Sequence, residues 1–479
     1  MTRLLFTTLP TNDLGLLARS LPIARELAAR GHKVFFCSPA QAPSRLIAEA
    51  GFENLVPRHP IYDLMTVQLT PRGIVRFVAS GQWKRRYGSL FRFLSMLISA
   101  LPIKSAPSTP DTWNMDHAAA QMGMLNEGFV RASCDAWKEL MTDCEADVIV
   151  DFWNPFAVIA ARAAKKPVVT VIQADAHPDS QGFIWWKTPP SDIPTTVPVV
   201  NKVLAGYNLQ PVRKFGELSV GDLTLVAGTP ETDPLPDHAN VTYVGPILWQ
   251  KTESRLPDWI SDLSKDKPLI WVYSGNPRYS SANGSFDSVV VLQACVAALA
   301  GEDVQVVLTT GYHPLPKEVL PLPANFRHEP YLPGLAMAER SNLLIHHGGY
   351  GSCQTGLVTG TPAVIIPTYA ERESNARRIA ALGAGAFVPV QSVSGKKHVL
   401  VEELRATVRR VLADPSFADN ARRMSEKILA YGGASQAARL IERFGQVNGA
   451  ATVDDIVGEL GSPMCRQTPA QGKRYTTGD

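Results

Sequence analysis

The hydrophobic pattern of the first forty residues predicts a strand, a helix and a second strand. Residues 3–8 (RLLFTT) and 33–39 (KVFFCSP) are short apolar runs typical of fully buried strands. Residues 17–30 between them repeat apolar side chains at helical spacing, and Gly31 follows as a residue that commonly ends a helix. This order of elements is how a parallel α/β sheet begins.

The same alternation continues in two series. Further strands of the first series are predicted at 146–152, 166–173, 223–228 and 241–247. The second series has predicted strands at 268–275 and 304–311 and in three later apolar runs, a helix at 285–301, and helical periodicity over 399–444 with a break at Asp414-Pro415. The stretch 60–145 is less regular and rich in aromatic residues. We therefore expect an α/β fold with domains at 1–248 and 268–446, a linker at 249–267 and a loose tail at 447–479.

Composition narrows the class of protein. A chain of 479 residues is too long for one ordinary domain, and a net charge of +3 without basic stripes argues against a nucleic-acid partner. The six cysteines lack zinc-like spacing, and three of them (Cys37, Cys295 and Cys353) lie in apolar stretches, so we expect reduced, buried thiols. No apolar run is long enough to span a bilayer, and the start does not read as a signal peptide. We expect a cytoplasmic protein, monomeric or homodimeric.

The most informative stretch is IHHGGYGSCQTG at 345–356. An apolar strand leads into two histidines, three glycines and a segment that can begin a helix. Glycines let the backbone approach a ligand closely, and the first amides of a helix attract an anion. His347 and Ser352 add side-chain donors. The pattern indicates a diphosphate site, and the alternative is a tight turn between a strand and a helix.

The segment from His346 to Gly385 resembles the donor-binding signature of the family 1 nucleotide-sugar glycosyltransferases. The matching positions are His347, Gly349, Ser352, Gly360, Pro362, Pro367, Glu371, Asn375 and Gly383. The segments YLPGLAMAERSNLLIHHGG and SLPIARELAARGHKV also resemble the family, and the resemblance extends to about residue 445. It implies the GT-B fold, in which two Rossmann-like domains with parallel sheets face each other across a cleft. It further implies an N-terminal acceptor domain, a C-terminal donor domain whose last helix can pack back on the N-terminal domain, and an inverting, metal-free reaction.

The resemblance assigns donor-binding roles to named residues. His347 and the amides around Gly349, Gly351 and Ser352 are expected to hold the diphosphate. Further donor contacts are expected from Ser274, Gly275, Tyr331, Leu332 and Glu371. Tyr331 stands where the family often has a Trp that stacks on the base, although a core role is an alternative.

Two departures from the signature concern the donor. Thr355 replaces the usual Glu that holds both ribose hydroxyls, which favours a thymidine-type sugar nucleotide over a uridine-type one. Arg372 replaces the usual Gln beside Glu371. A permanent cation there could bind a charged sugar or a phosphate, or could instead pair with Glu371 or Glu373.

A third departure concerns the catalytic base. The family usually places a His, sometimes an Asp, in the first loop, and this position is Leu16 here. Asp151 matches the aspartate that orients the base, and Asp13 lies near Leu16. One alternative is that Asp151 or Asp13 is the base, with a pKa raised by burial, although Asp13 could simply cap the next helix. The acceptor could also need little activation, or the protein could bind sugar nucleotide without transferring the sugar.

The acceptor is expected to be small and hydrophobic, with Leu16 and Trp153 at its site and further aromatics of 83–153 and Trp185-Trp186 as candidates. The leading prediction is an inverting glycosyltransferase that uses a UDP- or dTDP-sugar as co-substrate and no other cofactor. A non-catalytic auxiliary protein that binds sugar nucleotides is the first alternative, and an epimerase of the same fold is the second.

Overall fold

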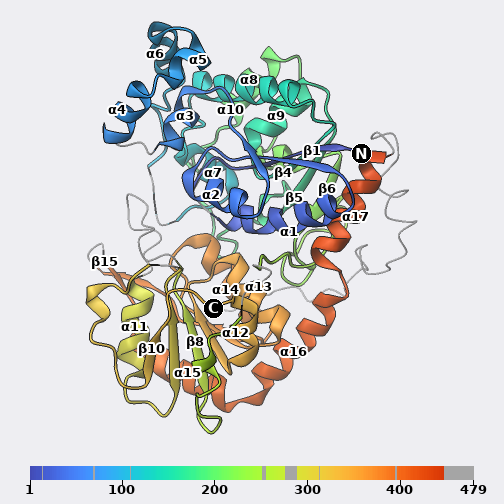
Figure 1. Ribbon diagram of the computed structural model, residues 1–479. Coiled ribbons are helices and arrows are strands. Elements are labelled where there is room, and N and C mark those ends of the chain that lie inside the picture. Colours follow the sequence, from blue (N-terminus) through green and yellow to red (C-terminus); the bar gives the residue numbers. More distant parts are fainter. Residues whose placement is uncertain are drawn as a thin grey trace.

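The computed structural model describes residues 1–12, 14–67, 71–107, 109, 111–250, 255–275, 289–311, 313–393 and 396–446. Figure 1 shows two α/β domains, with the N-terminal domain above the C-terminal one. Each domain contains one parallel sheet with helices on both faces, so the predicted α/β class with two Rossmann-like domains is confirmed.

The N-terminal sheet has seven strands in the order β3-β2-β1-β4-β5-β6-β7, all paired in parallel. The strands are β1 (Arg3–Thr8), β2 (Lys33–Cys37), β3 (Glu53–Leu55), β4 (Val148–Phe152), β5 (Val168–Ile172), β6 (Leu223–Val226) and β7 (Thr242–Tyr243). The chain order reverses between β1 and β4, and ligands of such sheets bind beyond the carboxyl ends of the strands at this point. Thr7 and Asp151 are register partners there.

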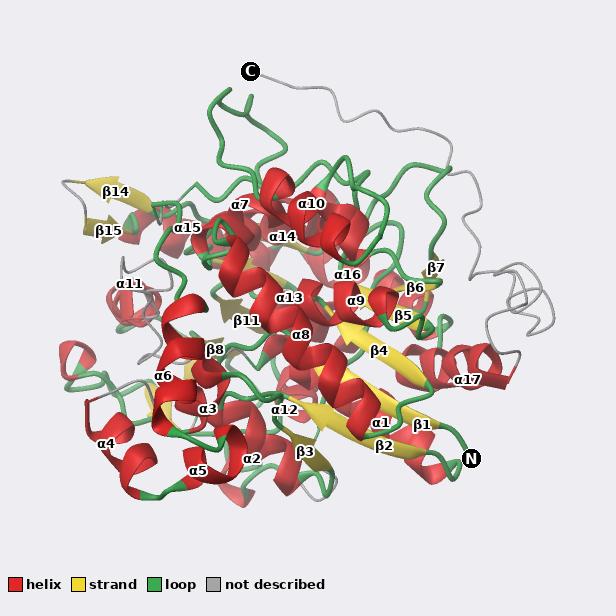
Figure 2. Cartoon of the chain, turned by 90° about the horizontal axis from the view of Figure 1, so that it is seen from above, coloured by secondary structure: helices red, strands yellow, loops and turns green. Residues whose placement is uncertain are grey.

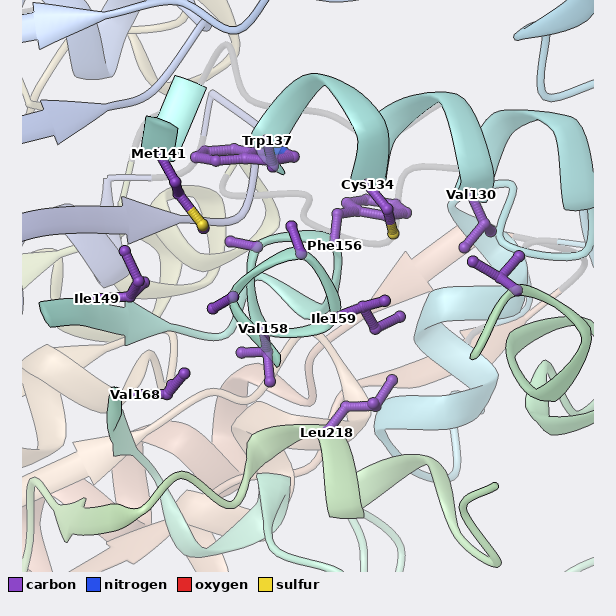
Figure 3. Close-up of a cluster of buried hydrophobic side chains, with 14 of the residues drawn as sticks. Val130, Cys134, Trp137, Met141, Ile149, Phe156, Val158, Ile159, Val168 and Leu218 are labelled. Atoms are coloured by element: carbon purple, nitrogen blue, oxygen red, sulfur yellow. The ribbon is translucent and has the colours of Figure 1, made fainter. Parts of the chain in front are cut away.

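Helices cover both faces of this sheet because its strands are apolar on both sides. They are α1 (Gly15–Ala29), α2 (Gln41–Glu49), α8 (Glu127–Asp143), α9 (Pro155–Ala163) and α10 (Val197–Gly206). Figure 3 shows one of the resulting clusters, which contains Trp137 and Met141 of α8, Ile149 of β4, and Phe156 and Ile159 of α9. This core fixes the loop after β4, where α9 begins.

The C-terminal sheet has six strands in the order β10-β9-β8-β11-β12-β13, again parallel. The strands are β8 (Leu269–Tyr273), β9 (Gln305–Thr309), β10 (Phe326–His328), β11 (Leu343–His346), β12 (Ala363–Ile365) and β13 (Gly385–Phe387). The helices of this domain are α11 (Val289–Leu299), α12 (Gly334–Arg340), α13 (Tyr350–Thr359), α14 (Ala370–Ala381) and α15 (Val401–Ala413). A hairpin of β14 (Gln391–Val393) and β15 (Lys396–His398) lies at the periphery, as seen in Figure 2.

The last two described helices carry the chain back to the N-terminal domain. α16 (Pro415–Leu429) packs on α13, and α17 (Gly433–Gln446) packs on α1. Leu440, Ile441 and Phe444 of α17 are buried in the same cluster as Leu17 and Leu21 of α1. The two domains are therefore joined twice, and Figure 1 shows α17 alongside the upper domain.

The stretch 60–145 is more regular than its sequence pattern indicated. It contains the short helices α3 (Pro60–Thr66), α4 (Pro71–Ala79), α5 (Gln82–Tyr87), α6 (Leu90–Ser99) and α7 (Met115–Gln121), followed by α8. Helices α3 to α6 share a small core of their own, formed by Leu64, Phe77, Tyr87 and Phe93. In Figure 1 helices α4 to α6 project from a corner of the N-terminal domain.

Candidate active site

The imidazole of His347 lies between two backbone segments of the C-terminal domain. His347 follows β11, and Gly275 follows β8, the strand beside it. A methyl group on Gly349 would lie 2.6 Å from His347 Nε2, and one on Gly275 would lie 3.2 Å from the same ring. Both positions therefore require glycine for the ring to sit where it does. The predicted motif thus places an imidazole at the carboxyl ends of the two central strands.

Helix α13 begins directly beside this ring. Gly349 is its N-cap residue, and no side chain caps the helix there. Gly351 is exposed, with open space where its side chain would be, and Ser352 is half-buried. The first amides of a helix carry its positive dipole end and mostly lack partners within the helix. In α13 the Ser352 amide donates to the Gly349 carbonyl oxygen at 3.0 Å. The start of α13 and His347 therefore form a site suited to an anion, and Figure 1 places α13 on the side facing the N-terminal domain.

Burial sets the protonation state of His347. Removal from solvent lowers its pKa well below the ordinary value, and the nearby Arg372 and His346 lower it further. The ring is therefore neutral at pH 7 and has one N–H to donate. Its Nδ1 lies 3.5 Å from the Tyr273 carbonyl oxygen, and Nε2 faces Gly349. An anion at Nε2 would favour the proton on that nitrogen, or a doubly protonated ring.

Helix α14 brings an acidic side chain to the same turn. The Asn375 amide donates to Glu371 Oε1 at 2.7 Å and to the Gly348 carbonyl oxygen at 3.1 Å, which fixes the carboxylate relative to the glycine turn. Burial raises the pKa of Glu371, whereas the Asn375 hydrogen bond and the charge of Arg372 lower it. A carboxylate held in this way is able to accept hydrogen bonds from sugar hydroxyls.

The two donor-side departures occupy defined positions. The Arg372 guanidinium donates to Thr368 Oγ1 at 2.5 Å, and Glu373 is paired with Arg377 instead. The Thr355 hydroxyl donates to the Gly351 carbonyl oxygen at 2.9 Å within α13. Its proton is thus used inside the helix, and its oxygen remains an acceptor.

The remaining predicted donor residues differ in how far their side chains are exposed to solvent. Ser274 is buried and its hydroxyl donates to the Gly275 carbonyl oxygen at 3.2 Å. Tyr331 is half-buried. Leu332 is buried in a hydrophobic cluster of the C-terminal domain, so only its main chain could reach a ligand. The side chain of Leu332 is therefore a core residue.

Asp151 is the penultimate residue of β4 in the N-terminal domain and is almost fully buried, with 1% of its surface exposed. Its Oδ1 accepts a hydrogen bond from the Thr7 hydroxyl at 2.5 Å, and the backbone N–H of Asn154 donates to its Oδ2 at 3.0 Å. Burial raises the pKa of Asp151 to about 7, and these hydrogen bonds act in the opposite direction. The carboxyl group is thus poised near neutral pH, as acid–base chemistry requires.

An apolar cavity of about 250 Å³ lies beside this loop. Its lining comes from the loops after β1 and β4, from α3 and from α7–α9, and includes Leu9, Pro10, Tyr62, Met65, Phe129, Trp153 and Phe156. Trp153 has a positive φ of 56°, and its buried indole Nε1 has no hydrogen-bond partner. A strained backbone and an unused donor are typical of positions kept for a ligand.

The other predicted acceptor residues are not among the residues that line this cavity. Leu16, on α1, is half-buried and packs against the core of the N-terminal domain. Trp185 and Trp186 were candidates for the acceptor site, but they contact α14 of the other domain, where Trp185 Nε1 donates to Ser374 Oγ at 3.1 Å. Asp13 lies outside the described residues.

A buried polar network that the sequence did not predict joins the two domains. Arg378 of α14 pairs with Asp175, which follows β5, at 2.6 Å. The Tyr350 hydroxyl at the start of α13 lies 2.7 Å from Asp233 Oδ2 and from the Ala227 carbonyl oxygen. These contacts hold the anion-binding end of α13 against the N-terminal domain. Tyr350 stands inside the glycine motif, but its partner is more than a hundred residues away, so no local signal identifies the pair.

Arg19 is the second unpredicted feature. It projects from α1 with its guanidinium 5.0 Å from the centre of the Tyr350 ring, within reach of a cation–π interaction. One contact is a long hydrogen bond of 3.5 Å to Gln173, and its Nη1 is buried without a hydrogen-bond partner. Its charge also lowers the pKa of Glu371. The N-terminal domain therefore places a cation with an unused donor beside the start of α13.

Comparison with known proteins agrees with this architecture. A family model described as erythromycin biosynthesis protein CIII-like, C-terminal domain, matches residues 293–442. The chain is 32% identical to 4'-demethylrebeccamycin synthase of Lentzea aerocolonigenes over 203 aligned residues. The aligned region covers 42% of this chain and 44% of that protein. The chain is 32% identical over 209 residues to a PGL/p-HBAD biosynthesis glycosyltransferase of Mycobacterium tuberculosis, covering 43% and 44%. The chain thus matches less than half the length of each of these two relatives.

Solved structures resemble the whole fold. The calicheamicin glycosyltransferase CalG4 aligns with a TM-score of 0.63 at 20% identity over 93% of this chain and 99% of its own. The glycosyltransferase VinC, solved in complex with dTDP, aligns with a TM-score of 0.60 at 17% identity over 93% and 100%. The fold is therefore GT-B, and the predicted resemblance to glycosyltransferases is confirmed over the matched parts of the chain. No helix among the described residues has the length and apolar character needed to cross a bilayer.

Proposed function

We propose that this protein is an inverting, metal-independent glycosyltransferase that transfers a sugar from a UDP- or dTDP-sugar to a small hydrophobic acceptor. The observation that carries the proposal is the uncapped start of α13 with His347 held between Gly275 and Gly349. The relatives that are named glycosyltransferases support the same class of reaction. The absence of an Asp-x-Asp motif from the sequence supports a reaction without a bound metal.

On the donor side, the α13 amides and His347 bind the diphosphate and stabilise it as the leaving group. Arg19 contributes its free Nη1–H from the N-terminal domain to a donor oxygen. Glu371 accepts hydrogen bonds from the sugar, and Tyr331 packs against the base. Thr355 offers a single acceptor oxygen to the ribose, which favours a dTDP-sugar because its deoxyribose has one hydroxyl fewer.

On the acceptor side, the cavity beside Trp153 binds an apolar molecule, and the indole Nε1–H donates to one of its oxygens. Asp151 is the general base, because its raised pKa matches proton transfer near neutral pH. The proton reaches it directly or through the Thr7 hydroxyl, which already donates to its carboxylate.

The test is to incubate the protein with UDP- and dTDP-sugars and a panel of phenolic and polyketide acceptors, and to detect product by mass spectrometry. We expect a glycoside of inverted anomeric configuration, formed equally well with EDTA present. His347→Ala should bind nucleotide more weakly and turn over far more slowly. Product formation that depends on an added metal, or unchanged nucleotide affinity in His347→Ala, would contradict the proposal.

One observation favours the auxiliary alternative. Leu16 offers no acid–base group at the usual position. The Asp151 carboxylate already accepts hydrogen bonds from the Thr7 hydroxyl and the Asn154 backbone N–H. Tight binding of UDP or dTDP without product or donor hydrolysis over the whole panel would indicate a protein that binds sugar nucleotides for another purpose.

A further inference from the structure

The projecting helices α4 to α6 expose an unusual number of apolar side chains. Nine of the fifteen large hydrophobic side chains that are exposed among the described residues lie between residues 74 and 103. They are Ile74, Val75, Val78, Leu90, Phe91, Leu94, Ile98, Leu101 and Ile103. Phe91 is 83% exposed and Ile98 is 68% exposed. Scattered apolar residues are normal on a protein surface, but a concentration of this kind marks an interaction site.

Two of these helices are apolar on two faces. In α6, Phe93 points into the small core shared by α3 to α6, whereas Phe91, Leu94 and Ile98 recur at helical spacing on the exposed side. In α4, Phe77 is buried in that core, and Ile74, Val75 and Val78 are exposed. The inner face explains why the helices fold, and the outer face has no role in that packing. These nine apolar side chains, together with the exposed basic residues Arg72, Arg76, Lys84, Arg85, Arg92 and Lys104, are called the 71–104 surface below.

The same surface is strongly basic. Residues 64–110 contain seven Lys and Arg residues and no Asp or Glu. The rest of the chain has 40 basic and 44 acidic residues, so the positive charge of the protein is concentrated here. The exposed basic residues are Arg72, Arg76, Lys84, Arg85, Arg92 and Lys104. Arg86 differs, because it is half-buried and paired with Asp63.

We propose that the 71–104 surface binds the surface of an anionic lipid membrane, with the exposed apolar side chains inserted at the headgroup level. Short helices with exposed apolar side chains flanked by Lys and Arg have this property, and each basic residue adds attraction to anionic lipid. A second copy of the chain is a poor occupant, because the same face would bring two concentrations of positive charge together.

Docking in this way would place the acceptor cavity beside the lipid. Met65 of α3 and Pro102, just after α6, are both part of the cavity lining. An apolar acceptor dissolved in the membrane would then lie close to the cavity that Met65, Pro102 and Trp153 line. The membrane interaction itself does not depend on the proposed sugar transfer and is measured without it.

The experiment is co-sedimentation of the full chain with vesicles of phosphatidylcholine alone and of equal parts phosphatidylcholine and phosphatidylserine. We expect at least tenfold more bound protein with the anionic vesicles, and release as the salt concentration rises. Phe91→Ser combined with Ile98→Ser should reduce binding at least tenfold, and so should Arg76→Glu combined with Arg92→Glu.

Matched controls lie elsewhere on the surface. Leu429→Ser removes a side chain that is 63% exposed on α16, and Lys265→Glu reverses an exposed charge in the linker region. Both controls should bind vesicles like the unmodified protein, and circular dichroism should show that every variant is folded. Absence of binding to anionic vesicles, or equal binding by the Phe91/Ile98 variant, would overturn the proposal. A dimer that dissociates in that variant while vesicle binding persists would assign the surface to self-association instead.

Discussion

Replacing Asp151 by asparagine should change how the stability of the N-terminal domain depends on pH. Burial raises the pKa of this carboxyl from 3.8 to about 7 in the folded protein. Between those two values the folded state keeps a proton that the unfolded state has lost. The contribution of Asp151 to the free energy of unfolding is therefore largest below the pKa of the unfolded state. It is lost as the pH rises through the pKa of the folded state.

The size of the effect follows from the pKa difference. A difference of about 3 pH units at ~1.4 kcal/mol per unit corresponds to about 4 kcal/mol. The substituted asparagine would be uncharged at every pH. It also presents one acceptor oxygen instead of two to the Thr7 hydroxyl and the Asn154 amide, and this loss of ~1–3 kcal/mol does not vary with pH. The stability of the variant relative to wild type should thus rise by about 4 kcal/mol from about pH 4 to about pH 8.

Guanidinium unfolding, followed by tryptophan fluorescence at closely spaced pH values, measures this difference directly. Asp147→Asn is the matched control, because Asp147 is exposed and directly precedes the same strand. Turnover of Asp151→Asn at pH 8 should fall by about a hundredfold or more if Asp151 is the base. A difference in stability between Asp151→Asn and wild type that does not change with pH would refute the reasoning.

Three further predictions concern the donor site and the domain interface. Gly349→Ala should weaken nucleoside diphosphate binding at least tenfold, measured by calorimetry, because the new methyl group would displace the His347 ring. Arg19→Met should weaken binding of the same ligand about tenfold while the protein keeps its helical circular dichroism spectrum, since a neutral side chain still packs on the neighbouring ring. Arg378→Met should lower the free energy of unfolding by ~3–5 kcal/mol, because it leaves Asp175 buried without its cation. Adding Asp175→Asn to that variant should restore part of the loss, and a single variant as stable as wild type would show that the ion pair does not stabilise the interface.

Much of the fold could be predicted because parallel strands are continuous apolar runs. The strands β1, β4 and β8 lie within the predicted segments, each within a few residues of the predicted bounds. The break at Asp414-Pro415 was also correct, because Asp414 caps α16 through the Ser416 amide and Pro415 occupies the first turn. Helices α3 to α6 were missed, since each has ten residues or fewer and apolar residues on more than one face.

The relative placement of the predicted donor residues follows from their local spacing. His347, Gly349 and Glu371 all lie within a stretch of 25 residues, where strand, turn and helix follow in order. Arg19 and the pair Tyr350–Asp233 were not predictable in this way. Their contacts join segments more than a hundred residues apart, and they exist only because α17 and the interface loops bring the two domains together.

The central claim is that the start of α13 and His347 bind a diphosphate. A crystal structure of the protein grown with UDP or dTDP tests it most directly. We predict phosphate oxygens within hydrogen-bond distance of the Gly351 amide, the Ser352 hydroxyl and His347 Nε2, with Arg19 reaching the ligand from the other domain. A nucleotide bound away from α13, with the His347 ring still turned only toward the Tyr273 carbonyl, would contradict the claim.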